Sequence, residues 1–203
     1  MLSGLNKDCE HIVYFYLPLE FTLFRYKNDI KLHKLIKSHN TSLEINLFIK
    51  DGHIETIRYL ITAGHQFISY HLDLAVKYGN LEIVKCLISQ KIKPNLKTIE
   101  IAIKNEHLEI LKYFNSIHIK LGHNIAIYAS RSGHVDIIKY LISLGIVFVK
   151  FEFADAVICG HLYVCKYFVS MSLNDYEVVS LKLASRYGHL EIVKYLRTLG
   201  IEP

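Results

Sequence analysis

A short phrase recurs six times along this chain of 203 residues. Each copy has a glycine or its substitute, a polar residue, and then a run of apolar residues broken by an acid and a base. The copies begin at Gly52, Gly79, Glu106, Gly133, Gly160 and Gly188, so the intervals are 27, 27, 27, 27 and 28 residues. Such a fixed period is typical of stacked arrays, whose units cannot bury their apolar faces alone. We therefore predict a solenoid whose function lies on a surface rather than in a pocket.

Each unit contains two helical patterns, one before and one after the glycine. After it, apolar residues such as Leu81, Val84 and Leu87 follow the spacing of a helix with a broad buried stripe. Before it, an alanine allows close approach of neighbouring helices; this alanine recurs as Ala75, Ala102, Ala129, Ala156 and Ala184, with Phe48 as the exception. The prediction is an all-α array of antiparallel helix pairs joined by tight turns.

The glycine ends the first helix of each pair, where a left-handed residue is easiest to place. Glu106 in this position costs on the order of 1 kcal/mol if the turn is kept. Stacked helices lie about 8–10 Å apart, whereas each ligand lies about 2 Å from a zinc ion, so successive histidines cannot share a metal. We predict a structural role in the turn for Gly52, Gly79, Gly133, Gly160, Gly188, His53, His107, His134, His161 and His189.

The repeats predict two regions. Residues 1–43 are expected to form an N-terminal cap with a degenerate repeat, and residues 44–203 an array of six repeats at about 44–70, 71–97, 98–124, 125–151, 152–179 and 180–203. The apolar run over residues 12–24 is interrupted by Pro18 and Glu20 and falls short of the roughly 20 residues that span a membrane. We interpret this run as a buried part of the cap.

Sequence motifs of enzymes are missing from the chain. No P-loop, HExxH, GxSxG or GxGxxG pattern occurs, and the four cysteines have no CxxC spacing. We expect no enzymatic activity, no cofactor, no metal and no small-molecule substrate, and a reducing compartment for the cysteines.

Two stretches carry a family resemblance. Residues 188–196 (GHLEIVKYL) and 133–141 (GHVDIIKYL), each four residues after an alanine, resemble the second half of an ankyrin repeat. The resemblance implies an ankyrin-type helix-turn-helix solenoid over about residues 44–203. Ankyrin units usually run about 33 residues and begin with Thr-Pro-Leu-His, which is absent here, so we expect the hairpins between repeats to be shortened to tight loops.

The resemblance extends to a type of source. Short ankyrin arrays rich in lysine, isoleucine and tyrosine are similar to those of giant DNA viruses of the mimivirus type. This similarity implies an intracellular protein, in the cytoplasm of a host cell.

Two columns of charge run through the repeats. The first pairs an acid with a base three residues later, as in Glu82 and Lys85, and is expected on the solvent side of the second helix. The second column lies two residues before the glycine, is basic except for Ile158, and lacks matched acids. By resemblance, the two positions before the glycine face a concave groove and contact partners; we predict contacts from Lys50, Lys77, Tyr78, Lys104, Asn105, Arg131, Ile158, Arg186 and Tyr187.

The basic column favours a non-catalytic scaffold that binds an acidic protein segment with one apolar anchor. An alternative is an electrostatic binder of nucleic acid or another polyanion, which the net charge of +5 permits. The column is also compatible with solvated helix ends, where bases are favoured by the helix dipole. Asp155 stands where other repeats have apolar or aromatic residues, so it is expected to need a partner or a looser repeat.

Overall fold

The computed structural model describes residues 41–122, 124–171 and 178–202. The predicted cap, with its apolar run over residues 12–24, lies outside the described residues except for its last three positions. The chain divides into two compact units, residues 1–67 and 68–203, which are described separately.

The first unit contains one helix pair among its described residues, α4 (Thr41–Lys50) and α5 (Ile54–Thr62). Ile45 and Ile49 of α4 and Ile57 and Leu60 of α5 are buried, and the two helices pack together. The pair therefore has the predicted form of one repeat.

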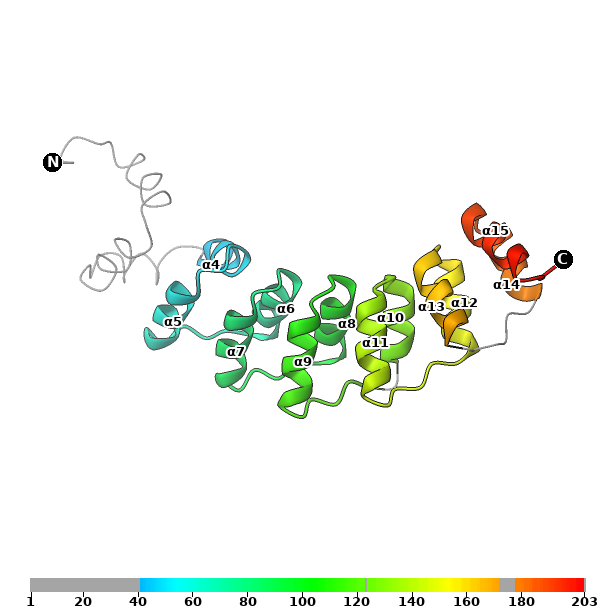
Figure 1. The fold of residues 1–203 in the computed structure, drawn as a ribbon. Coiled ribbons are helices and arrows are strands. Elements are labelled where there is room, and N and C mark those ends of the chain that lie inside the picture. The colour runs from blue at the N-terminus through cyan, green and yellow to red at the C-terminus, as the bar shows by residue number, and fades with distance from the viewer. Residues whose placement is uncertain (1–40, 123, 172–177, 203) are drawn as a thin grey trace, which may run out of the picture. The chain divides into compact units, whose positions relative to one another are not determined.

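The second unit has five helix pairs among its described residues, and each pair joins a first and a second helix. The first helices are α6 (Ser69–Lys77), α8 (Leu96–Lys104), α10 (Ile125–Ser132), α12 (Lys150–Ile158) and α14 (Val178–Arg186). The second helices are α7 (Leu81–Ser89), α9 (Leu108–Ser116), α11 (Val135–Ser143), α13 (Leu162–Ser170) and α15 (Leu190–Thr198). Within this unit each first helix packs against the next first helix, and the second helices form a row beside them (Figure 1).

The described segments that join successive repeats contain no strand. Only residues 90–95 separate α7 from α8, and residues 144–149 separate α11 from α12. The predicted all-α solenoid with shortened hairpins is therefore confirmed.

The core of the second unit follows the two predicted stripes. Ile83, Val84 and Leu87 of α7 are buried, as are their counterparts in the other second helices. The five alanines of the first helices have no exposed surface, which confirms that close helix packing leaves no room for a larger side chain there.

The turn within each repeat has the predicted geometry. Gly79 has φ of +75°, the Gly79 N–H donates to the Val76 carbonyl (3.1 Å), and the Asn80 N–H donates to the Ala75 carbonyl (3.0 Å). These two bonds form a Schellman motif, which satisfies carbonyls at the end of α6. Glu106 keeps the same turn, with φ of +60°.

The first helices begin with a feature that the sequence analysis did not identify. The third residue of α6, α8 and α12 is a buried polar residue whose side chain accepts a backbone N–H from three positions earlier. His71 accepts from Ile68 (3.1 Å), Thr98 from Asn95 (3.2 Å) and Glu152 from Val149 (2.9 Å). These side chains cap the start of the helix. In the sequence, a polar residue within an otherwise apolar stripe could have indicated this role.

Candidate interaction surface

In the last four repeats, the histidine that follows the turn residue joins its repeat to the preceding one. Its Nε2 lies at hydrogen-bond distance from the carbonyl oxygen of the residue two positions before the preceding repeat's glycine. The pairs are His107 with Lys77 (3.0 Å), His134 with Lys104 (3.3 Å), His161 with Arg131 (2.8 Å) and His189 with Ile158 (2.8 Å). Because a carbonyl can only accept, each Nε2 carries the proton and donates it.

The same ring lies over the glycine of the preceding repeat. A Cβ added to Gly79 would lie 2.7 Å from His107, and one added to Gly160 would lie 2.6 Å from His189. Glycine is therefore favoured twice, by the left-handed backbone and by the ring that fills the space of a side chain.

Glu106 is the exception to this arrangement. The ring of His134, which lies next to it, has the longest of the four contacts with a carbonyl, and its Nδ1 lies 3.3 Å from Glu106 Oε2. The turn with a Glu106 side chain in place of glycine therefore has the longest histidine–carbonyl contact, between the repeats of α8 and α10.

The predicted contact residues of the second unit lie at the ends of its first helices. Lys77, Tyr78, Lys104, Asn105, Arg131, Arg186 and Tyr187 are exposed, and Ile158 is half-buried. Lys77 Nζ lies 5.7 Å from the centre of the Tyr78 ring, and the Asn105 amide donates to the Ile101 carbonyl (2.8 Å). Lys50 is exposed at the end of α4, in the first unit, and is described apart from this row.

The prediction that the basic column lacks matched acids is wrong for two of its members. Lys104 Nζ lies 2.6 Å from Glu100 Oε1, one turn earlier in α8. Arg131 reaches from α10 to α12, where its Nη2 and Nε each lie 2.9 Å from Asp155 Oδ1. The repeat pattern did not indicate these two acids, because Glu100 lies outside the repeated phrase and Asp155 lies on the next first helix. Asp155 thus has the partner that its position required.

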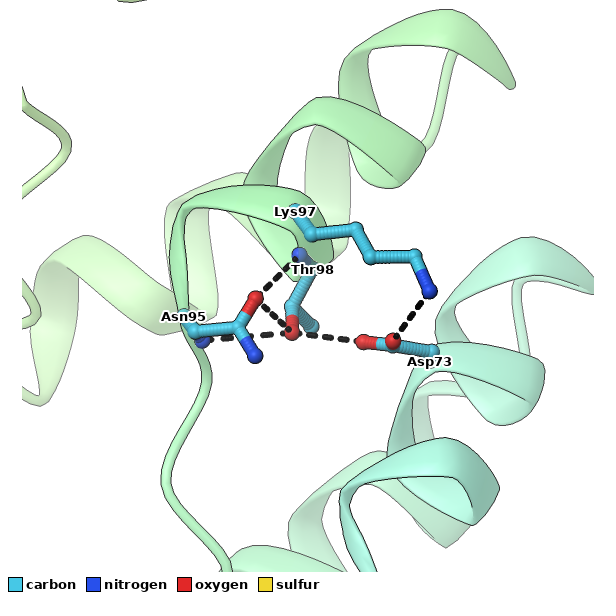
Figure 2. Close-up of polar contacts among 4 residues, drawn as sticks. All are labelled: Asp73, Asn95, Lys97 and Thr98. Atoms are coloured by element: carbon cyan, nitrogen blue, oxygen red, sulfur yellow. Dashed lines mark hydrogen bonds and ion pairs between the residues drawn. The ribbon is translucent and has the colours of Figure 1, made fainter.

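A second polar link joins α6 to α8 (Figure 2). Asp73 is only 8% exposed; its Oδ1 accepts the Thr98 hydroxyl (2.6 Å) and its Oδ2 lies 3.5 Å from Lys97 Nζ. Asn95 Oδ1 in turn accepts the Thr98 N–H (3.0 Å). The start of α8 is therefore capped internally and tied to the preceding repeat.

The second helices of both units have the predicted acid–base pairs. They are Glu55 with Arg58 (3.9 Å), Glu82 with Lys85 (2.7 Å), Glu109 with Lys112 (2.6 Å), Asp136 with Lys139 (3.0 Å) and Glu191 with Lys194 (2.7 Å). In α13 Tyr163 replaces the acid, and Lys166 Nζ instead lies 5.5 Å from the centre of the Tyr195 ring. All of these pairs are exposed and add little stability each.

The thiols of the fifth repeat differ in environment. Cys165 is buried in α13, and burial raises its pKa to about 12. Cys159 is exposed next to Asp155; partial burial and the Asp155 charge raise its pKa, while Arg131 lowers it.

The described residues contain neither a cluster of metal ligands nor a membrane-spanning helix. No three histidine, cysteine, aspartate or glutamate side chains in this part of the chain are grouped to hold a metal ion. No helix in it is long and apolar enough to cross a membrane.

Comparison with known proteins agrees with the geometry. The family model for ankyrin repeats matches residues 72–151 in three copies, whereas no curated protein matches the chain. Ankyrin repeats are generally protein–protein interaction modules and typically have no enzymatic activity. The described residues form an all-α helical repeat solenoid, and the stretch over residues 72–151 is similar to three ankyrin repeats.

Proposed function

We propose that this chain is a non-catalytic scaffold that binds a protein partner through the exposed face of its first helices. The observation that carries the proposal is the row of exposed side chains at the ends of α6, α8, α10 and α14. In stacked repeats such a row forms one extended surface. The resemblance to ankyrin repeats makes this face the concave one.

The charge of the row favours an acidic partner. Lys77 and Arg186 are exposed and form no ion pair with the described residues, whereas Lys104 and Arg131 have acids beside them. Tyr78 and Tyr187 lie next to the two unpaired bases, and aromatic residues and arginine are enriched among residues that dominate binding. We assign the contacts to these six residues together with Asn105 and Ile158, and to Lys50 in the first unit.

The proposal extends to organisation, location and source. The array over residues 44–203 is the binding part of the chain. Cys86, Cys159 and Cys165 form no disulfide bond among the described residues, which suits a reducing, cytoplasmic compartment. The similarity to short ankyrin arrays of giant DNA viruses supports a viral protein that acts in its host cell.

A cross-linking experiment tests the face. A photoreactive phenylalanine analogue replaces Tyr78 or Tyr187 on the first-helix ends, or Tyr163 on the second-helix row as the control. All three side chains are exposed, so all three variants are expected to fold. In the native cell, Tyr78 and Tyr187 should each yield an adduct with the same protein, and Tyr163 should yield none. Adducts from Tyr163 alone would contradict the proposal.

The electrostatic alternative predicts a different result. A polyanion binder would cross-link to nucleic acid, would lose its partner steeply with added salt, and would not distinguish between sequences. The pairing of Lys104 and Arg131 with acids reduces the free positive charge on the face and favours the protein partner.

A further inference from the structure

We infer that the first-helix face is divided, and that its α12–α14 part binds a protein segment with a bulky apolar side chain followed by a carboxylate. This inference rests on the proposed function, because it assigns the principal contact to one part of the proposed face. Four exposed side chains, Val147, Val149, Phe151 and Val179, make up the apolar patch of this part.

Equivalent positions in successive repeats reveal the apolar patch. Three positions, at 13, 11 and 9 residues before the glycine, precede or begin each first helix. The repeat of α8 has Lys93, Asn95 and Lys97 there, and the repeat of α10 has Lys120, Gly122 and Asn124. The repeat of α12 instead has Val147, Val149 and Phe151.

These apolar residues are not part of the core. Val147 is 76% exposed and Phe151 is 69% exposed, and Val149 is also exposed. Val179 takes the position of Phe151 in α14 and is 53% exposed. Because α12 packs against α14, equivalent residues are neighbours on the surface, at the usual helix spacing of about 8–10 Å. The fold tolerates polar residues at these positions, so four exposed apolar side chains together indicate a contact with a partner.

A stripe of residues connects the apolar patch to the basic column. Phe151, Asp155 and Ile158 are spaced by four and three residues, so they lie along one side of α12. Arg131 neutralises Asp155, which leaves this side without an unpaired charge. The stripe therefore presents an apolar side chain at each end, with a charge-balanced ion pair between them.

The matching side of α14 ends in positive charge. Val179, Leu183 and Arg186 have the same spacing as the residues on α12, and Lys182 lies beside them. Lys182 and Arg186 are exposed, and neither forms an ion pair with a described residue. A carboxylate of the partner would find two bases there, one turn from each other.

The α6–α8 part of the face has a different character. Asp73 is bound by Lys97 and Thr98, and Lys104 is bound by Glu100, so most of its charges are satisfied within the chain. Tyr70 on α6 and Ile68 just before it are exposed, but polar residues of α8 and α10 separate them from the apolar patch. The principal apolar contact is therefore assigned to α12 and α14.

The geometry specifies the spacing within the partner segment. Phe151 and Ile158 are seven residues apart on a helix, and Val179 and Arg186 likewise, which corresponds to about 10 Å along the axis. An extended segment covers that distance in about three residues. The occupant is therefore an apolar residue with Asp or Glu about three positions away.

A displayed library of random 12-residue peptides tests this inference on the whole chain. Clones are selected on the wild type and counter-selected on a Phe151→Ser, Arg186→Glu variant. The enriched peptides should share the apolar residue and the acid at that spacing. Affinity for one labelled peptide should fall about tenfold or more with Phe151→Ser and again with Arg186→Glu. A peptide with Lys in place of its acid should recover binding to Arg186→Glu.

The matched control is Tyr163→Ser with Lys166→Glu, which makes comparable changes on the exposed side of α13, outside the proposed face, and should leave peptide affinity unchanged. Peptides that depend on Tyr70 and Lys77 instead would overturn the division of the face but would support the proposed function. Failure to enrich any peptide on the wild type over the counter-selected variant would overturn the inference alone, since cross-links from Tyr78 and Tyr187 test the scaffold separately.

Two other occupants are distinguished by further measurements. Self-association in sedimentation experiments that Phe151→Ser abolishes would identify a second copy of the chain and overturn the inference. Binding of single-stranded oligothymidylate that Phe151→Ser leaves unchanged, with no selected peptide, would identify a polyanion and overturn it as well.

Discussion

The imidazole ring of His161 fills the space beside Gly133 that a side chain at Gly133 would need. A Cβ on Gly133 would lie 2.5 Å from His161 Nδ1, while His161 Nε2 donates to the Arg131 carbonyl two residues before that glycine. The turn of one repeat and the histidine of the next therefore constrain each other. This relationship makes the histidine column a set of links between repeats.

The first prediction compares two glycines with the same backbone conformation. Gly133 and Gly188 have φ of +83° and +76°, but a Cβ on Gly188 would meet nothing within 4 Å. Gly188→Ala should lower the free energy of unfolding by about 1 kcal/mol through backbone strain alone. Gly133→Ala should cost about 1 kcal/mol more, because the ring must move and lose its hydrogen bond. Urea unfolding measures both.

The double variant Gly133→Ala, His161→Ala provides the control for this comparison. If the ring causes the extra cost, the two substitutions should be less than additive. Equal costs at Gly133 and Gly188 would show that the histidine contact contributes nothing.

The second prediction concerns Glu106. Glu106→Gly should raise the free energy of unfolding by about 1 kcal/mol, because it removes the left-handed strain of a side chain that is otherwise exposed. Glu106→Ala is the matched control; it removes the carboxylate near His134 but keeps the strain, so it should not stabilise. Stabilisation by the alanine variant would instead identify the carboxylate as the unfavourable group.

The third prediction concerns the link between α6 and α8. Asp73→Ala should lower the free energy of unfolding by about 1–3 kcal/mol, because it removes the shorter hydrogen bond of the buried Thr98 hydroxyl and leaves only the longer one to Asn95 Oδ1 (3.2 Å). Asp73→Asn keeps an acceptor and should cost less. Asp136→Ala, which breaks the exposed pair with Lys139, is the control and should cost under about 0.5 kcal/mol. Equal losses for Asp73→Ala and Asp136→Ala in thermal unfolding would refute the structural role of Asp73.

The fourth prediction concerns thiol reactivity. Burial raises the pKa of Cys165 to about 12, so its thiol stays protonated and covered in the folded protein. At pH 8 iodoacetamide should modify the exposed Cys159, at a rate below that of a free thiol because its pKa is also raised. Cys165 should react only after denaturation. Peptide mass spectrometry in a Cys9→Ser background measures both, and rapid labelling of native Cys165 would contradict its placement.

The fifth prediction concerns pH and the first unit. Burial lowers the pKa of His65 below the ordinary value of 6.5. At a pH between the lowered pKa of the folded state and the ordinary pKa of 6.5, the unfolded state binds more protons than the folded state, so stability rises with pH. As the pH falls below 6.5 the folded state should lose stability until the lowered pKa is reached. His65→Gln should reduce the slope of the urea midpoint against pH, and an unchanged slope would show that His65 titrates alike in both states.

The pattern of the sequence was sufficient for the parts of the fold that depend on neighbouring residues. Ala75 and its counterparts indicated close packing, and the glycine step indicated the turn, because helical spacing and left-handed backbone are local properties. The basic column was correctly located at the first-helix ends, but its electrostatic state was not. Whether Lys104 and Arg131 are paired depends on Glu100 and Asp155, and the phrase contains neither.

What the sequence by itself determined was the repeating unit: two helices, a buried alanine, a glycine turn, and an array that must stack to bury its apolar stripes. What only the tertiary structure decided was how one repeat contacts the next. The Arg131 and Asp155 side chains lie 24 residues apart in sequence, and His161 lies 30 residues from the carbonyl it binds. Such pairings depend on the register of stacked helices, which periodicity within a unit does not specify.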